Sequence, residues 1–187
     1  LTQCDSCIGS KSSINFGVYK NLLGCFHPPC AIYVDTAFLD TLPPLEFDSG
    51  LGEMLHYFLV SGPDDVAMFD RVADRVISDR QLLLTLIRRS LEIKKAMVEL
   101  DEFDRGPRNV FNYGHSFGHA LETCTDFDVP HGVAVGYGMD LANLVSVDHG
   151  LVAMAWRNRM RRVIQRVWRR KPLGDVNIDR FLEALSH

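Results

Sequence analysis

The spacing of apolar side chains predicts that the chain is helical from about residue 46 onward. Within residues 46–60 apolar side chains recur three or four positions apart, as on one face of a buried helix: Phe47, Leu51, Met54, Leu55 and Phe58. Gly62 and Pro63 should end this helix. Asp64 is a candidate N-cap for a second helix that runs to about Ile77.

A helical period continues to the end of the chain. A third helix should begin at Ser78 or Asp79, and its inward side chains are expected to be Leu83, Leu84, Ile87, Leu91, Met97 and Val98. Further helices are expected over residues 113–124, 131–149, 151–168 and 179–185, and Gly150 is suited to ending the second of these. The predicted fold class is therefore mainly α.

The first 45 residues have a different pattern. Residues 1–30 are rich in Ser, Gly, Asn and Lys without a long apolar period, so we expect loops and a short strand. Residues 31–35, Ala-Ile-Tyr-Val-Asp, form a short apolar run that predicts a buried strand. Pro43 and Pro44 then break the chain. We therefore divide it into a strand-and-loop segment, residues 1–45, and a helical domain, residues 46–187.

Composition narrows the class of protein without identifying it. The 187 residues are 47% apolar and 24% charged with a net charge of −4, which is typical of globular proteins and points to neither nucleic acid nor membrane. The start of the chain lacks the pattern of a signal peptide. Five cysteines at irregular spacings favour reduced thiols in a cytoplasmic protein, and Cys4 and Cys7 lack a second pair of soft ligands at a suitable spacing for zinc.

A basic stretch near the end of the chain has two interpretations. Residues 156–171 contain seven Arg and one Lys and no acid, interleaved with apolar side chains, which could indicate an RNA-binding helix. The interpretation that we favour is a surface helix that buries one face and turns its charge toward an acidic neighbour, because the rest of the chain is acidic.

Three histidines and one acid form a candidate metal site. His115 and His119 are four residues apart, so they share one face of a helix. His131 stands at a predicted helix start, and Glu53 stands among apolar helical positions where a carboxylate is costly to bury without a cation. One carboxylate and two imidazoles leave a fourth position open on zinc, as in catalytic sites. The alternative is that the histidines are ordinary core residues.

The same residues lie in motifs that identify a family. Residues 106–122, G-P-R-N-V-F-N-Y-G-H-S-F-G-H-A-L-E, resemble the G-x-R-x-x-x-N-x-G-H-[ST]-x-G-H-A-x-E signature of dehydroquinate synthases. Residues 131–139 resemble the H-G-x-A-V-x-x-G-M segment that follows it, and residues 5–15, 19–24, 41–43 and 49–53 resemble upstream family motifs in the same order. The chain therefore resembles the helical C-terminal domain of a 3-dehydroquinate synthase-like sugar-phosphate cyclase, and residues 1–45 resemble a remnant of its N-terminal α/β domain.

The resemblance implies a role for each matching residue. The implied metal ligands are Glu53, His115 and His131. The implied substrate-binding residues are Asp5, Lys20, Asn21, His56, Lys94 and Arg108, and the cofactor-binding residues are Asp5, Lys11 and Asn21. His119, Lys11 and Asn112 are implied to be catalytic. The implied cofactors are NAD⁺ and Zn²⁺ or Co²⁺, the substrate is a phosphorylated sugar, and the implied assembly is a homodimer that includes an N-terminal NAD-binding half.

Some positions and some functions stay open. His56 stands where the family usually has a lysine, so a contact to an anionic substrate should be weaker. Lys95 could be the inward residue instead of Lys94, and Arg108 and Asn112 could brace a loop instead of binding substrate. We expect this chain to lack most of the NAD site and to be inactive alone. The alternative functions are a metal- and NAD-dependent polyol dehydrogenase of the same superfold and a non-catalytic metal-binding module.

Overall fold

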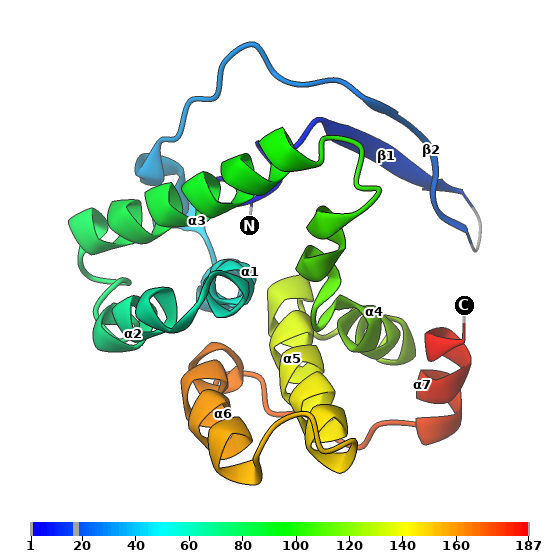
Figure 1. Cartoon of the computed structure of the whole chain (residues 1–187). Helices are drawn as coiled ribbons and strands as arrows, with labels where there is room; N and C mark the ends of the chain where they lie inside the picture. The colour runs from blue at the N-terminus through cyan, green and yellow to red at the C-terminus, as the bar shows by residue number, and fades with distance from the viewer. Residues whose placement is uncertain (1, 17–18, 187) are drawn as a thin grey trace.

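The structure is a computed structural model that describes residues 2–16 and 19–186, without the side chains of Asn15 and residues 19–22. It opens with an antiparallel hairpin of β1 (Lys11–Phe16) and β2 (Tyr19–Phe26), in which Lys11 pairs with Phe26 and Ser13 with Gly24. A coil then leads from β2 to the 3-10 helix η1 (Thr36–Thr41). As Figure 1 shows, the hairpin and this coil lie to one side of the helices.

Helices form the rest of the described chain, as the apolar pattern predicted. They are α1 (Pro44–Ser61), α2 (Pro63–Val72), α3 (Arg80–Leu100), the 3-10 helix η2 (Pro107–Asn112), α4 (His115–Cys124), α5 (His131–Asp148), α6 (Met154–Trp168) and α7 (Ile178–Leu185). Asp79 caps α3, since its carboxylate accepts hydrogen bonds from the amides of Gln81 and Leu82, both at 3.1 Å. The prediction of a mainly helical fold is confirmed.

Helix α1 lies at the centre of the helical domain and contacts α2, α3, α5 and α6. Its apolar face packs into a core whose fully buried members include Leu55, Phe58, Phe69, Leu86 and Ile164. Burial of one such side chain contributes about 1.5–3 kcal/mol. The core therefore holds α1 and α5 together, and the candidate metal ligands lie on these two helices and on α4.

Two glycines allow α1 and α5 to meet at backbone distance. A Cβ atom added to Gly52 would lie 2.1 Å from the carbonyl oxygen of Gly132, and one added to Gly132 would lie 1.8 Å from the carbonyl oxygen of Ser49. The amide of Gly132 also donates a hydrogen bond of 2.9 Å to the Ser49 hydroxyl. Because neither glycine has a side chain, the residues that follow Gly52 and precede Gly132, namely Glu53 and His131, come close together.

Several local predictions are wrong. Helix α2 starts at Pro63 with Gly62 as its N-cap, so Asp64 lies in the first turn, and the helix ends at Val72 instead of Ile77. The apolar period continues to the buried Val76. After Val72, however, tight turns replace the helix, and one of them is closed by a hydrogen bond of 2.8 Å from the Arg75 amide to the Val72 carbonyl.

The predicted strand at residues 31–35 and the predicted inward position of Leu84 are also wrong. Residues 31–35 form no strand, and Tyr33 is 93% exposed. On α3 the fully buried residue is Leu86, whereas Leu84 is 36% exposed. A strand needs a hydrogen-bonded neighbour, and the described part of the chain supplies none to these residues.

The basic charges of α6 and the turn after it face acidic neighbours. Arg166 contacts Asp70 at 2.9 Å and also Asp74, which Arg169 contacts at 2.9 Å. Apolar side chains of α6 such as Val167 are buried on the opposite face. This arrangement agrees with the interpretation of a surface helix. Separately, no helix within the described residues combines the length and apolar character needed to cross a membrane.

Candidate metal centre and anion-binding residues

A buried carboxylate lies at the centre of the candidate site. Glu53 is in the middle of α1 and is 2% exposed. Its Oε2 atom is buried and has no hydrogen-bond partner within the described residues. A buried carboxylate without a compensating donor or cation is costly, so its surroundings should supply positive charge.

Two imidazoles point at this carboxylate from two other helices. His115 is the first residue of α4 and His131 is the first residue of α5. Their Nε2 atoms lie 3.6 Å and 3.5 Å from Glu53 Oε2. These distances are too long for good hydrogen bonds. Donors bound to one tetrahedral zinc ion at about 2.0–2.1 Å lie roughly 3.3 Å apart. The distances from Glu53 Oε2 to the two Nε2 atoms therefore fit ligands of one shared divalent ion better than direct hydrogen bonds between the side chains.

Gly114 sets the direction of His115. It is the N-cap of α4, and its φ angle of 80° is in the left-handed region. An added Cβ there would lie 2.5 Å from Met139 Cγ, on α5. The sequence predicted that α4 starts at Tyr113, but the left-handed turn delays the start by two residues and places His115 in the first turn.

A second layer of acceptors holds both histidines in the orientation that a metal needs. The Nδ1 atom of His131 lies 3.2 Å from both carboxylate oxygens of Glu122, and the Nδ1 atom of His115 lies 3.4 Å from the Tyr113 carbonyl. An acceptor at Nδ1 favours a proton on that nitrogen and leaves the Nε2 lone pair for a metal. The acceptors behind the two histidines therefore also suit the binding of a divalent ion.

Glu122 is a functional candidate that the sequence analysis did not single out. It lies on α4 two turns after His115 and is 8% exposed. A signal was present, since residues seven apart share one helix face. The acid was overlooked because no pattern on α4 alone shows that this face meets the start of α5.

The charges of the cluster shift two pKa values. Burial tends to raise the pKa of Glu53, but the facing imidazoles of His115 and His131 hold that pKa well below its usual range. Burial tends to lower the pKa of His131, but Glu122 and Glu53 raise it to about 10. The cluster thus holds a carboxylate in its charged form and favours positive charge beside it.

His119, the second histidine of the motif at residues 106–122, lies beside the metal candidates. The ring of His119 is 5.6 Å from the ring of His115 and stacks on that of His131 at 5.5 Å. His119, Glu122 and His131 also have ligand atoms within 4.8 Å of one another, which makes them a second possible metal group. Both groups contain His131. They differ in their carboxylate, which is Glu53 in the first group and Glu122 in the second.

His56 lies behind Glu53 and is not exposed. Its ring is 4.8 Å from those of Tyr57 and His115, and Phe111 packs 5.9 Å away. Burial lowers its pKa to about 3, so the imidazole is neutral. The sequence predicted a weaker anion contact here than a lysine would give. The enclosed ring is uncharged at neutral pH, and the weaker contact stays a prediction.

Several predicted anion-binding residues converge around the loop at residues 5–9. Lys94 bonds to the carboxylate of Asp5 and donates a 3.1 Å hydrogen bond to its carbonyl, and the Tyr57 hydroxyl bonds to the same carboxylate. Arg108 donates hydrogen bonds to the carbonyls of Gly9 at 3.3 Å and Glu102 at 2.8 Å. Of the two lysines that the sequence left open, Lys94 is the inward one, since it is 8% exposed and Lys95 is exposed.

Two other predicted residues whose side chains the structure describes, Lys11 and Asn112, lie outside the cluster. Lys11 forms an ion pair with Asp104 at the start of β1. Asn112 is exposed at the end of η2, three residues before His115. Lys20 and Asn21 are on β2, and their side chains lie outside the part of the chain that the structure describes.

Sequence comparisons match one family along the chain. The model for the 3-dehydroquinate synthase C-terminal domain matches residues 50–187, and the model for the N-terminal domain matches residues 1–49. The 3-dehydroquinate synthase of Bartonella tribocorum is 38% identical over 179 residues, which are 94% of this chain and 48% of that protein. The same enzyme of Citrifermentans bemidjiense is 38% identical over 189 residues, 100% of this chain and 52% of that protein. The chain spans about half the length of the curated relatives it matches.

Solved structures of two cyclases have the same fold. The 2-epi-5-epi-valiolone synthase of Streptomyces hygroscopicus subsp. jinggangensis, with NAD⁺ and Zn²⁺ bound, superposes with a TM-score of 0.86 at 26% identity, over 99% of this chain and 52% of that one. A 2-deoxy-scyllo-inosose synthase complexed with carbaglucose-6-phosphate, NAD⁺ and Co²⁺ superposes with a TM-score of 0.88 at 25% identity, over 99% of this chain and 51% of that one.

Proposed function

Because the chain belongs to the 3-dehydroquinate synthase family, we propose that it is the metal- and substrate-binding half of a sugar-phosphate cyclase. The complete enzyme would convert a phosphorylated sugar to a carbocycle and release phosphate, using NAD⁺ and Zn²⁺ or Co²⁺. The observation that carries the proposal is the convergence of Glu53 Oε2 with the Nε2 atoms of His115 and His131, at 3.6 Å and 3.5 Å.

In this proposal Glu53, His115 and His131 hold the ion, and a metal bound there would polarise a substrate hydroxyl as a Lewis acid. Glu122 and the Tyr113 carbonyl orient the two imidazoles. His119 is beside both ligand histidines, where its imidazole can hold or move a proton at a substrate oxygen. The three protein ligands leave a position for substrate.

The basic residues around the loop at residues 5–9 would take the anionic part of the substrate. Arg108 and Lys94 approach Gly9 so closely that an added Cβ would lie 2.9 Å from Arg108 Nη2 and 3.2 Å from Lys94 Cε. A guanidinium and an ammonium group at one loop suit a phosphate. Lys11, Lys20, Asn21 and Asn112 keep their proposed roles in catalysis and in cofactor or substrate binding, and Asp5 is held between Lys94 and Tyr57.

Neutral His56 suggests a substrate with less negative charge near Glu53. A lysine there would place a cation beside the bound sugar, whereas this imidazole is enclosed and uncharged.

A homodimer and a cytoplasmic location are part of the proposal, on the family resemblance alone. We also propose that the 187 residues do not turn over without the nucleotide-binding part of the family.

Two experiments test the proposal. Co²⁺ binding, followed by visible absorption, should be lost in Glu53→Gln, His115→Ala and His131→Ala but kept in His149→Ala, an exposed histidine at the end of α5. The chain joined to a nucleotide-binding half of a relative should release phosphate from a phosphorylated heptulose only with NAD⁺ and the metal present. Oxidation of simple polyols without phosphate release would contradict the cyclase and indicate a polyol dehydrogenase.

A further inference from the structure

Tyr113 connects a metal candidate to the facing helix. Its backbone carbonyl lies 3.4 Å from Nδ1 of His115, two residues further along the chain. Its hydroxyl donates a hydrogen bond of 2.7 Å to Oδ1 of Asn143, on α5. The carbonyl and the hydroxyl of this one residue therefore contact α4 and α5 at the same time.

Asn143 is a buried amide, 4% exposed. Within the described residues, the bond from Tyr113 is the one hydrogen bond of its side chain, and its Nδ2 atom has no partner there. A buried amide is costly unless its polar atoms are paired, whereas an apolar side chain of similar size has no such requirement. Packing alone therefore gives no reason for an asparagine at this position, but an acceptor for the Tyr113 hydroxyl does.

The backbone next to Tyr113 also touches α5. A Cβ atom added to Gly138 would lie 2.0 Å from the Gly114 carbonyl oxygen, and one added to Gly114 would lie 2.9 Å from the Met139 amide nitrogen. The peptide between Tyr113 and Gly114 is thus held between this close contact and the hydrogen bond to Asn143. Because that peptide contains the carbonyl that faces His115, the carbonyl has little freedom to turn away.

Helix α6 restrains the turn of α5 that carries Asn143. Asp140, one turn before Asn143, is 8% exposed and contacts Arg157 at 2.7 Å and Arg161 at 3.0 Å, both on α6. Charge-assisted contacts of a carboxylate with guanidinium groups are short and directional. The acceptor for the Tyr113 hydroxyl therefore has a defined position.

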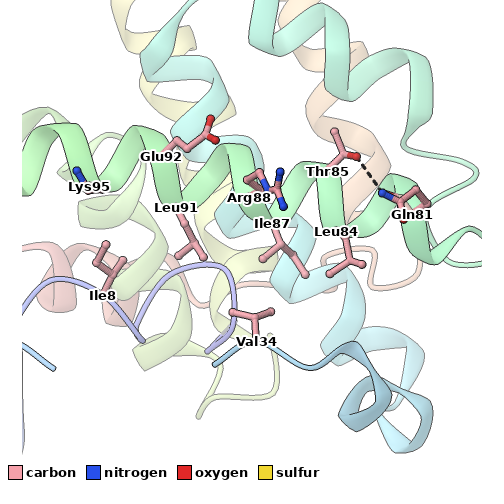
Figure 2. Close-up of a pocket in the computed structure, with 10 residues that line it drawn as sticks. All are labelled: Ile8, Val34, Gln81, Leu84, Thr85, Ile87, Arg88, Leu91, Glu92 and Lys95. Atoms are coloured by element: carbon pink, nitrogen blue, oxygen red, sulfur yellow. Dashed lines mark hydrogen bonds between the residues drawn. The ribbon is translucent and has the colours of Figure 1, made fainter. Parts of the chain in front are cut away.

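The groove beside α3 takes no part in this arrangement. Figure 2 shows it between α3 and the segment that carries Ile8, with Leu91 among its lining residues. Its volume is about 510 Å³, and its lining includes none of Tyr113, His115 and Asn143. The orientation of His115 is therefore set in the packed interior between η2, α4 and α5.

We propose that Asn143 and Tyr113 are positioning residues of the candidate metal centre. The hydrogen bond between their side chains keeps the Tyr113 carbonyl opposite Nδ1 of His115, which favours a proton there and leaves Nε2 for the ion. In this role neither residue touches the ion. The inference rests on the proposed function, because it takes His115 as a metal ligand.

Two substitutions remove the hydrogen bond, one from each side. Tyr113→Phe deletes the hydroxyl and keeps the ring, and Asn143→Leu replaces the acceptor by an apolar side chain of similar size. Each should weaken Co²⁺ binding about three- to tenfold, less than the loss of an acceptor that contacts the ligand directly. Tyr137→Phe is the matched control, since the Tyr137 hydroxyl on α5 bonds to the Lys171 carbonyl, and it should keep the affinity of the parent chain.

The double variant, Tyr113→Phe with Asn143→Leu, separates positioning from folding. Both partners are then apolar, so urea unfolding without metal should show a stability close to that of the parent chain. The Co²⁺ affinity should stay as low as in the single variants, because all three lack the same bond. A double variant that regains the parent affinity would overturn the proposal, and so would a loss in Tyr137→Phe equal to that in Tyr113→Phe.

A proton NMR spectrum of the Co²⁺-loaded chain reports on the His115 contact itself. The Nδ1 proton of His115 should exchange with water faster in Tyr113→Phe than in the parent chain, whereas that of His131, which faces Glu122, should be unchanged. Parent-like affinity and exchange in both single variants, with Co²⁺ binding lost in Glu53→Gln, would overturn the positioning role alone. Co²⁺ binding that survives in Glu53→Gln would contradict the proposed function and, with it, the positioning role.

Discussion

Removal of the Glu122 carboxylate should weaken metal binding through His131, although Glu122 itself need not touch the ion. His131 Nδ1 lies 3.2 Å from both oxygens of that carboxylate, which is 8% exposed and thus little screened by water. Glu122→Ala removes both the acceptor and the charge. Loss of such an outer-layer partner typically costs 10–100-fold in metal affinity, or about 1.4–2.7 kcal/mol.

Glu122→Gln separates the two contributions. The amide oxygen can still accept from His131 Nδ1, so the ring keeps its tautomer, but the negative charge that makes the ring a stronger ligand is gone. We therefore expect a loss intermediate between the parent chain and Glu122→Ala. Glu99→Gln is the matched control, because Glu99 is 62% exposed and contacts Lys95 on the surface.

The assay is a Co²⁺ titration in competition with a chelator of known affinity, followed by visible absorption. The reasoning is refuted if Glu122→Ala, still folded by circular dichroism, binds Co²⁺ within about twofold of the parent chain. If the ion instead binds the second group, His119, Glu122 and His131, the variants should behave differently. Glu122→Gln would then abolish Co²⁺ binding as completely as His131→Ala, and His119→Ala would weaken Co²⁺ binding while Glu53→Gln would not.

Two further predictions concern stability. Gly52→Ala should destabilise the fold by about 1–3 kcal/mol or more in urea unfolding, because the added Cβ would lie 2.1 Å from a carbonyl oxygen of the facing helix. Gly174→Ala is the control and should be nearly neutral, since Gly174 has open space around it. Equal effects of the two substitutions would contradict the close helix contact. Hydrogen bonds from Arg89 hold the pKa of Asp65 below its usual range, so their stabilisation is present above the unfolded pKa of about 3.9 and is lost as pH falls through the lower folded pKa. Asp65→Asn should therefore cost about 0.2–1 kcal/mol at pH 7 and nothing well below that pKa, and thermal melts that show the same cost at both pH values would contradict it.

The sequence was most informative where local chemistry decides the structure. The apolar period of α1 and the cap at Asp79 depend on neighbours within a few residues, and both were predicted closely. Glu53 and His131 were predicted as partners of His115 from their unusual placement and from motifs, and the structure brings the three side chains together.

Most of the omissions involve contacts between distant segments, and the error at the end of α2 has a local cause. Glu122 and Tyr57 act on His131 and Asp5, which belong to other elements, so no pattern within α4 or α1 could reveal them. The strand at residues 31–35 was predicted from its apolar run, but a strand forms only beside a partner. The end of α2 was missed because tight turns keep Val76 buried without a helix.

X-ray absorption of the zinc-loaded chain tests the central claim most directly. If Glu53, His115 and His131 hold one ion, the spectrum should show oxygen and nitrogen donors at about 2.0–2.2 Å, two of them imidazoles, with one ion per chain. Glu53→Gln should lose the ion, and His119→Ala should keep the spectrum of the parent chain. A sulfur donor at about 2.3 Å, which only a cysteine such as Cys4 or Cys7 could supply, or an unchanged spectrum in Glu53→Gln, would contradict the account.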